Sequence, residues 1–515
     1  MTLSQWFIFF IIVQLVHFIG TWKLYVSAGR KSWEAAIPVY NAIVLLKIIG
    51  RPTWWTVLLF LPIINLIIFP VIWVETLSCF GKNTTKDKVL AVATFGLYIA
   101  YVNYTQKLNY VADRSNEPVN KTADTISSLL FAIVVATFVH TYFIQPFTIP
   151  TSSLEKSLLV GDFLFVSKVN YGARTPMTTV ALPMVHDTIP LTKKKSYLTW
   201  PELPYFRLPG FQNIERNDIV VFNWPIDTVY KFRDQSGLRV DKPIDKKSNY
   251  VKRCVGVPGD QLEIKDGIIF VNGKELILPE RARPQFSYKI ALDGKTPIDF
   301  EYLLNDMDIT DGAGFMDAEK RDTLFIAALT ATNAERLQHF PGITGVQKII
   351  SKEVEPGIFP HINKWNRDNF GPIYIPQQGK TVPLNLETLP FYKAIITDYE
   401  KNILQVTGSE IRINGKIATS YTFQQNYYWM MGDNRHNSED SRYWGYVPEN
   451  HVVGKPTFIW MSYDSNGKGL KKIRWDRLFT TVSGEGQPQS YFKFFLLALV
   501  AYFIGEYFWK KKKSV

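Results

Sequence analysis

Apolar stretches alternate with polar, turn-rich stretches along this chain, and five apolar stretches are candidate membrane spans, of which 89–102 and 494–509 are short. A bilayer core needs about 20 consecutive apolar helical residues. A further stretch, 33–49, contains Pro38 and Lys47 and is predicted to be partly buried or re-entrant. The pattern therefore predicts membrane helices on both sides of a long central region. The five candidate spans are 6–22, 54–77, 89–102, 126–144 and 494–509.

The central region, about 146–489, has the pattern of a β-rich domain. Residues 218–222 and 250–257 are rich in β-branched and aromatic residues, which favours strands. Two Asn-Gly pairs predict hairpin turns, because a type I′ turn needs positive φ angles at both positions. These pairs are Asn272-Gly273 and Asn414-Gly415.

Two stretches of the central region are predicted to be insertions into its sheet framework. Residues 174–215 are proline-containing and loop-rich, and residues 280–425 are polar, turn-rich and mixed in pattern. Within the second insertion, the run 365–369 (Trp-Asn-Arg-Asp-Asn) forms a polar patch that we assign to a loop.

Composition narrows the class of protein. The net charge is +12 and 15% of the residues are aromatic, and Trp and Tyr gather beside apolar runs, as they do at membrane interfaces. We expect contact with a lipid bilayer and no nucleic-acid partner, because no compact Lys/Arg stripe or nucleic-acid motif occurs. The two cysteines, Cys79 and Cys254, cannot build a disulfide framework and are predicted to be buried free thiols.

Basic residues predict the orientation of the chain. The run 510–513 is four lysines and should be cytoplasmic by the positive-inside rule, which places the central region on the outer face. Basic residues in 23–51 place the first loop inside and the N-terminus outside. The lysines in 82–88 oppose this scheme, and the labels upstream of 89–102 invert if that segment does not span.

The candidate chemistry lies in the run 145–162 and in one distant lysine. Thr151, Ser152 and Ser153 form a hydroxyl cluster just after an apolar span, and Lys252 lies in an apolar strand. A serine hydroxyl needs a base, and neither a histidine partner nor a Gly-x-Ser-x-Gly elbow is evident. A lysine can serve as the base if burial lowers its pKa. This pattern indicates a serine/lysine peptidase.

Four segments resemble sequence boxes of the bacterial type I signal peptidases, in the same order. They are 145–162, 216–222, 250–260 and 431–445, and the last is the most specific. The resemblance implies a mainly β catalytic domain of the signal-peptidase and SOS-repressor-like fold. It also implies an inserted α+β subdomain and several transmembrane helices.

The pattern and the resemblance together predict six consecutive regions. These are an N-terminal membrane region at 1–124 with about three spans and a re-entrant segment, a transmembrane helix at 125–145, the first part of the catalytic core at 146–279, an inserted subdomain at 280–425, the last part of the core at 426–489, and a transmembrane helix with a basic tail at 490–515.

The resemblance also implies the roles of the hydroxyl cluster. The family's nucleophile is the second serine of an Ile-Pro-Ser-x-Ser run, which here corresponds to Ser153 and not Ser152. Thr151 replaces the first serine of that run, whose hydroxyl helps to form the oxyanion hole, and threonine keeps the donor. The backbone N–H of Ser153 is the second donor, and Lys252 corresponds to the general base.

Further residues take supporting roles by the same resemblance. Ser438 corresponds to the serine that orients the lysine, and Asp440 and Arg442 correspond to a supporting pair near the site. Seven residues correspond to positions that shape small apolar substrate pockets, although plain core packing is the alternative for each. They are Phe147, Ile149, Pro150, Leu154, Leu158, Tyr250 and Val251.

The function implied is removal of N-terminal signal peptides from exported precursors by a multi-pass protein of the bacterial cytoplasmic (inner) membrane. The catalytic domain is expected on the periplasmic side. Signal peptides of secreted precursors and the bilayer are the expected partners, with the secretion translocon as a further candidate. No metal or organic cofactor is expected.

Three other functions remain to be weighed. Residues 153–156 fit the Ser-x-x-Lys pattern of penicillin-binding proteins and β-lactamases, which also requires a Lys-Thr-Gly strand that this chain lacks. A self-cleaving repressor would require a DNA-binding module, whereas the N-terminus has a membrane pattern. A catalytically silent membrane scaffold of the same fold stays open.

Overall fold

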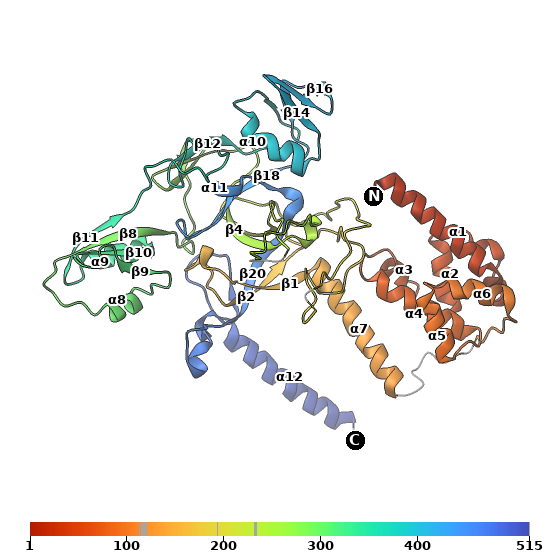
Figure 1. The fold of residues 1–515 in the computed structure, drawn as a ribbon. Coiled ribbons are helices and arrows are strands. Elements are labelled where there is room, and N and C mark those ends of the chain that lie inside the picture. The colour runs from red at the N-terminus through yellow and green to blue at the C-terminus, as the bar shows by residue number, and fades with distance from the viewer. Residues whose placement is uncertain (113, 115–120, 193, 231–233, 514–515) are drawn as a thin grey trace. The chain divides into compact units, whose positions relative to one another are not determined.

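The computed structural model describes residues 1–112, 114, 121–192, 194–230 and 234–513. The chain divides into two compact units, which are treated separately (Figure 1). The first unit contains residues 1–143, 174–208 and 228–247. The second contains residues 144–173, 209–227 and 248–515.

The first unit is helical, apart from its loops. One hydrophobic core, which includes Leu24, Leu46 and Ile64, joins its helices. The helices are α1 (Leu3–Ser27), α2 (Tyr40–Ile48), α3 (Trp55–Leu58), α4 (Asn65–Cys79), α5 (Thr85–Ala93), α6 (Leu97–Thr105) and α7 (Lys121–Tyr142), with a 3₁₀ turn at Ser32–Ala35.

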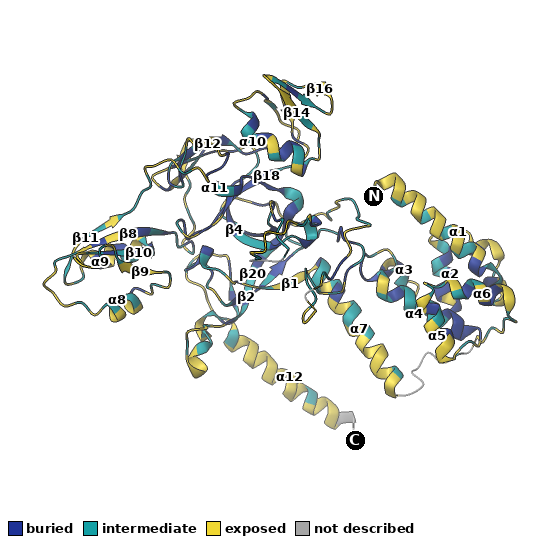
Figure 2. Ribbon diagram, in the orientation of Figure 1, coloured by how far each residue is buried: buried dark blue, intermediate teal, exposed yellow. Residues whose placement is uncertain are grey.

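Three helices of the described chain are long and apolar enough to cross a membrane, namely α1, α7 and α12 (Phe492–Lys513). Their side chains are largely exposed although they are apolar, as the yellow ribbons of α7 and α12 show in Figure 2. A helix that exposes apolar side chains all round is suited to a lipid environment. These helices contain the predicted spans 6–22 and 494–509 and most of 126–144.

The other two predicted spans differ from the structure. Segment 54–77 is divided between α3 and α4, and α4 is 15 residues long. Segment 89–102 is divided between α5 and α6 by Gly96, whose φ is +82°. A Cβ atom on Gly96 would lie 2.7 Å from Nε1 of Trp73. Neither segment is therefore a continuous helix of spanning length, and in 89–102 the left-handed Gly96, packed against Trp73, interrupts the apolar run.

The loops 174–208 and 228–247 fold with the N-terminal region and not with the sheet. The indole Nε1 of Trp6 donates a hydrogen bond of 3.0 Å to the carbonyl oxygen of Glu202. Ile63 packs with Ala181 and Tyr197 in a small apolar cluster. The predicted first core segment, 146–279, thus includes two excursions that belong to the other compact unit.

The second unit is mainly β, in agreement with the predicted fold class. Its largest sheet is antiparallel and runs in the order β1-β2-β20-β3-β4-β18-β19, with β21 paired to β20. The strands are β1 (Ile144–Thr148), β2 (Asp162–Ser167), β3 (Ile219–Asn223), β4 (Asn249–Gly256), β18 (Tyr427–Met431), β19 (Val447–Pro448), β20 (Val452–Ser462) and β21 (Thr480–Thr481).

The predicted strands and both hairpin turns are confirmed. Segments 218–222 and 250–257 correspond closely to β3 and β4. Positive φ angles of 53° and 77° at Asn272 and Gly273, and of 52° and 79° at Asn414 and Gly415, make the two turns that the Asn-Gly pairs predict. Cys79 and Cys254 are buried and free, also as predicted.

The predicted insertion 280–425 is not one body in the structure. Its first part forms a sheet in the order β11-β8-β10-β9 with its own apolar core, and we call residues 285–348 the insert sheet. In its later part, strand β12 (Phe370–Tyr374) pairs with β5 (Gln261–Lys265) of the catalytic core. This later part also shares a hydrophobic core with Trp429 of β18. The insert sheet consists of β8 (Gln285–Leu292), β9 (Ala313–Phe315), β10 (Thr323–Thr330) and β11 (Ile343–Lys348), with helices α8 (Phe300–Asp306) and α9 (Ala331–Gln338).

Shorter elements complete the second unit. These elements are β5 (Gln261–Lys265), β6 (Ile268–Val271), β7 (Lys274–Glu275), β12 (Phe370–Tyr374), β13 (Thr381–Pro383), β14 (Leu404–Thr407), β15 (Glu410–Ile413), β16 (Lys416–Ile417), β17 (Ser420–Thr422), α10 (Leu389–Ala394) and α11 (Ser441–Trp444).

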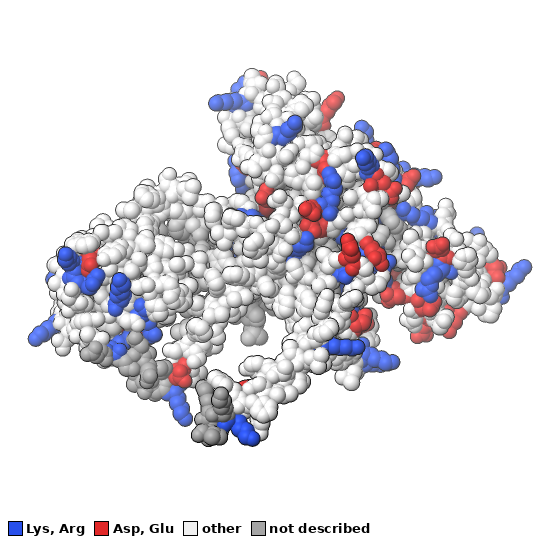
Figure 3. Space-filling view, turned by 180° about the vertical axis from the view of Figure 1, so that it is seen from behind, with Lys and Arg blue, Asp and Glu red and all other residues white. Residues whose placement is uncertain are grey.

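Charged side chains of both signs are intermingled on the molecular face that Figure 3 shows.

Candidate functional site

The predicted nucleophile lies in a short 3₁₀ turn, Ser152–Leu154, that follows the edge strand β1. Backbone hydrogen bonds of 2.9 Å from Ile149 N–H to the Asp162 oxygen, and from Gly161 N–H to the Ile149 oxygen, fix the chain before the turn. Leu154 inserts into the core below. Ser153 is consequently buried, with 8% of its surface exposed.

The predicted base reaches the nucleophile from the middle of β4. Lys252 pairs with Val220 of β3 and is 3% exposed. Its Nζ donates a hydrogen bond of 2.6 Å to Oγ of Ser153. Burial lowers the pKa of Lys252 to about 8, although the negative charges of Asp440 and Glu439 act in the opposite direction. A large fraction of the amine is therefore neutral at mildly alkaline pH, as a general base requires.

A buried ion pair that the sequence reasoning missed holds segment 431–445 against β4. Arg253, the residue after the lysine, donates hydrogen bonds of 2.8 and 2.5 Å to the two carboxylate oxygens of Asp433. The hydroxyl of Ser157 donates to the same carboxylate at 2.6 Å. The backbone N–H of Asn434 donates to the Ser153 oxygen at 3.1 Å. The only signal for this pair in the sequence is its place inside two of the quoted boxes.

Asp440 and Arg442 form the predicted pair, and both are almost completely buried. Nε and Nη2 of Arg442 lie 2.9 and 2.8 Å from the two carboxylate oxygens, and Gly432 N–H also donates to Asp440. Burial alone would raise the pKa of Asp440, but the charge and hydrogen bonds of Arg442 hold it below its usual value. The pair braces segment 431–445 and influences Lys252 through its charge.

Ser438 lies close to the nucleophile without the predicted hydrogen bond to the lysine. A Cβ atom on Gly432 would lie 2.2 Å from Oγ of Ser438 and 2.5 Å from the Ser153 oxygen, so this glycine permits their close approach. The Ser438 hydroxyl is buried, and within the described part of the chain it has no hydrogen-bond partner. The structure differs here from the prediction because Nζ of Lys252 is directed to Ser153.

The seven predicted pocket residues do not share one environment. Ile149, Leu154 and Leu158 are core residues, packed with Leu164 and other apolar residues of the sheet. Half-buried Phe147 and Val251 pack against the edge of the same core, and Pro150 is exposed.

Tyr250 lies in a neighbouring aromatic cluster. Its ring stacks on Trp224 at a centroid distance of 5.2 Å and meets Trp444 edge-on at 5.4 Å. The Nζ of Lys252 lies 5.4 Å from the centroid of the Tyr250 ring. The buried amine therefore has aromatic as well as aliphatic surroundings.

The site offers a hydroxyl and a buried amine, and the half-buried Thr151 immediately precedes the 3₁₀ turn. Among the described residues, no group of three or more His, Cys, Asp or Glu side chains is placed to hold a metal ion. The chemistry that these residues can perform is nucleophilic attack by Ser153 with proton transfer to Lys252.

Comparisons with known proteins point to the same chemistry. The family described as "Signal peptidase, peptidase S26" matches residues 122–323 and 375–461, which is more than half of the chain. Residues 33–113 match a family of unknown function, DUF5684. The chain is 24% identical to the signal peptidase I of Buchnera aphidicola subsp. Acyrthosiphon pisum over 73% of this chain and 87% of that protein.

Two further relatives match a smaller share of this chain and of their own length. The signal peptidase I of Haemophilus influenzae is 23% identical over 71% of this chain and 77% of that protein. That of Rickettsia typhi is 29% identical over 32% of this chain and 49% of that protein.

Proposed function

We propose that this chain, which belongs to the signal peptidase family, peptidase S26, removes signal peptides from exported precursors with a Ser153–Lys252 dyad. Family membership makes it a serine peptidase, and its apolar helices make it a membrane protein. The observation that carries the proposal is the 2.6 Å contact between Nζ of Lys252 and Oγ of Ser153, with both side chains buried.

The reaction proceeds through an acyl-enzyme. When Lys252 is neutral, the Ser153 hydroxyl can donate to Nζ across the same 2.6 Å contact, and the amine takes the serine proton as Oγ attacks the scissile carbonyl carbon. The Thr151 hydroxyl and the Ser153 N–H stabilise the oxyanion, a contribution that is typically large in acyl transfer. The lysine ammonium then protonates the leaving amine, and water hydrolyses the ester. In this proposal the Ser438 hydroxyl, which has no partner among the described residues, hydrogen-bonds the amine as it changes charge.

An open strand edge provides a place for an extended substrate. Strand β1 pairs only with β2 within the described sheet. An extended peptide can add to such an edge through main-chain hydrogen bonds. The half-buried Phe147 lies on this strand and, with Val251 of the same apolar core, would contact small side chains that precede the cleavage site.

The proposed orientation places the catalytic unit and the N-terminus on the outer face. The run of lysines 510–513 at the C-terminal end of α12 favours the cytoplasm. The loop 174–208 is flanked in sequence by strands of the catalytic unit, and its Glu202 oxygen accepts the hydrogen bond from Trp6 near the start of α1. A loop and a helix end in contact lie on the same side of a bilayer, so α1 runs from the outer face inward.

Cleavage of a precursor tests the activity. The full chain in liposomes, supplied with a precursor that has a small-x-small cleavage site, should release the mature protein with the expected new N-terminus. Ser153→Ala should abolish cleavage, whereas Ser152→Ala, the matched neighbour, should retain it. Cleavage by Ser153→Ala at the wild-type rate would overturn the proposal.

Labelling of engineered cysteines tests the orientation. Ser4 and Ser27 are exposed near opposite ends of α1, and the two native cysteines are buried. A membrane-impermeant maleimide added outside should label Ser4→Cys in intact cells and Ser27→Cys only after the membrane is opened. The reverse pattern would contradict the proposed orientation.

A further inference from the structure

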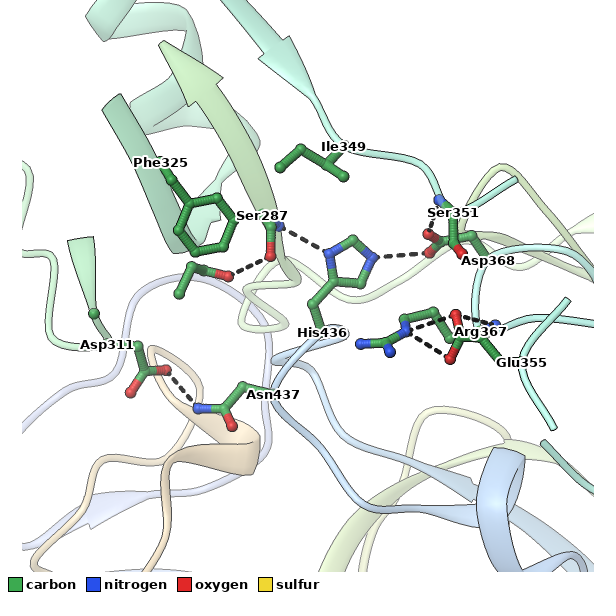
Figure 4. Close-up of a pocket in the computed structure, with 12 residues that line it drawn as sticks. Ser287, Asp311, Phe325, Ile349, Ser351, Glu355, Arg367, Asp368, His436 and Asn437 are labelled. Atoms are coloured by element: carbon green, nitrogen blue, oxygen red, sulfur yellow. Dashed lines mark hydrogen bonds and ion pairs between the residues drawn. The ribbon is translucent and has the colours of Figure 1, made fainter. Parts of the chain in front are cut away.

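A cavity of about 540 Å³ lies between the insert sheet and segment 431–445. This volume falls within the range of about 300–1,000 Å³ that is common for ligand pockets. Strands β8 and β10 contribute one wall, and Arg367 and Asp368 of the predicted polar patch contribute another (Figure 4). The patch that sequence reasoning assigned to a loop therefore lines a cavity.

One wall of this cavity is fixed by His436. Its Nδ1 accepts a hydrogen bond of 3.0 Å from the backbone N–H of Ser287, and its Nε2 lies 2.9 Å from a carboxylate oxygen of Asp368 (Figure 4). Because Nδ1 accepts, the ring proton is on Nε2 and is donated to Asp368. The histidine thus joins the insert sheet to the polar patch and gives the wall a defined geometry.

The opposite wall is hydrogen-bonded to the residue before the nucleophile. Nδ2 of Asn437 lies 3.1 Å from Oγ of Ser152 and 3.2 Å from a carboxylate oxygen of Asp311. Nδ2 of Asn434 bridges the same two residues, at 3.2 Å to the Ser152 oxygen and 2.5 Å to Asp311. The cavity therefore borders the 3₁₀ turn that carries Ser153.

The insert sheet is also joined to this segment through the backbone. The N–H of Gln285, the first residue of β8, donates to the Asp433 oxygen at 2.8 Å, and its carbonyl oxygen accepts from Arg435 N–H at 2.9 Å. These two backbone hydrogen bonds, with the hydrogen bonds of Asn434 and Asn437, fix the cavity walls relative to the turn that carries Ser153.

Acidic groups dominate the charge of the cavity. Glu355 is neutralised by Arg367, whose Nε lies 2.9 Å from it. Asp368 contacts a neutral histidine tautomer, and Asp311 contacts two asparagine amides and, within the described residues, forms no pair with a lysine or arginine. The cavity thus presents two carboxylates that no cationic side chain pairs with directly, and it favours a cationic guest.

The position of the cavity assigns it to one side of the cleavage site. The open edge of strand β1, which suits the residues before the scissile bond, contributes nothing to its lining. We propose, on the basis of the proposed function, that this cavity binds the first residues of the mature protein, after the scissile bond, and prefers a lysine or arginine there.

The test compares precursors that differ only in the second to fourth mature residues. One carries lysine, one glutamate and one alanine at these positions, and kcat/KM is measured with the full chain in liposomes. The lysine precursor should be favoured over the glutamate precursor by about threefold to tenfold, as for a partly exposed ion pair. This ratio should fall as salt is added.

Variants assign the preference to the cavity. Asp311→Asn removes a carboxylate that has no cationic partner, and Glu355→Gln, on a different wall, leaves the positive charge of Arg367 without its partner. Each should therefore bring the lysine-to-glutamate ratio toward one. The matched control is Asp308→Asn, which changes an exposed aspartate of the same loop that pairs with Lys156 outside the cavity and should keep the ratio. A purely structural effect of Asp311 would lower all three rates equally and leave the ratio unchanged.

The outcomes separate this inference from the proposed function. If the wild-type protein cleaves no precursor, the proposed function fails and this inference fails with it. If cleavage occurs but the lysine and glutamate precursors react equally, the inference alone is wrong. It is also wrong if neither Asp311→Asn nor Glu355→Gln changes the ratio.

Discussion

Nζ of Lys252 lies 2.6 Å from Oγ of Ser153, and burial of the lysine lowers its pKa to about 8. Below that pH the amine is protonated and cannot accept the serine proton, so kcat/KM should rise about tenfold per pH unit and level off above about pH 8. The measurement is a pH profile of precursor cleavage. A profile that is flat between about pH 6 and pH 9 would contradict a lysine base with this pKa.

Glu439 should tune that profile. Its carboxylate is exposed, and its negative charge raises the pKa of Lys252 against the effect of burial. Glu439→Gln removes the charge, so the pKa of Lys252 should fall and the rising limb of the profile should move to lower pH. Glu410→Gln, which changes a glutamate paired with Arg412 on β15, should leave the profile in place. A shift to higher pH in Glu439→Gln would be the opposite of this expectation.

Thr151 should contribute through its hydroxyl and not its methyl group. Thr151→Val keeps the shape but removes the donor, and loss of one oxyanion donor typically lowers kcat by about a hundredfold or more. Thr151→Ser keeps the donor and should remain close to wild type. The readout is kcat at saturating precursor for both variants. A valine variant with wild-type kcat would remove Thr151 from the oxyanion hole.

The Asp440–Arg442 pair should be structurally critical. Arg442→Ala leaves a buried carboxylate without its cation, which typically costs about 3–5 kcal/mol. Arg412→Ala, which breaks a pair on β15 with both side chains about two-fifths exposed, should cost less than about 1 kcal/mol. Denaturant unfolding in detergent measures both free energies. Equal loss of unfolding free energy in the two variants would contradict a larger contribution from the buried Asp440–Arg442 pair.

The local elements of the catalytic unit were predictable because they depend on short-range rules. Strands β3 and β4 follow from runs of β-branched residues, and the turns at Asn272-Gly273 and Asn414-Gly415 follow from the need for positive φ angles. The apolar neighbours of Lys252 suggested a base, but the resemblance of the four sequence boxes was needed to prefer it to a solvated strand lysine. Its burial agrees with that reasoning.

Other features depend on contacts that sequence patterns do not record. Hydropathy predicts a span at 89–102, but the packing of Trp73 against Gly96 divides it. The composition of 280–425 gives no sign that part of it joins the sheet of β5. The bridge from Asn437 to Ser152 connects residues 285 positions apart, so the cavity beside the nucleophile becomes visible only in the fold.

Replacement of Lys252 should separate activity from stability. Its pKa in the folded protein lies below the usual lysine value of 10.5, so burial of the amine opposes folding at neutral pH. This penalty lessens only as pH rises from about 8 toward 10.5. Lys252→Met should therefore unfold at a temperature equal to or above that of the wild type at pH 7. A much lower unfolding temperature would mean that the variant's inactivity reflects misfolding.

The most direct test of the dyad is the cleavage rate of one precursor by Lys252→Met and by Lys156→Met. Lys156 is the lysine of the competing Ser-x-x-Lys pattern and pairs with Asp308, away from Ser153. Lys252→Met should lose at least about a thousandfold in kcat/KM, as in other peptidases that lose a catalytic base, and Lys156→Met should cleave normally. Wild-type cleavage by Lys252→Met, or loss of activity in Lys156→Met alone, would contradict the Ser153–Lys252 mechanism.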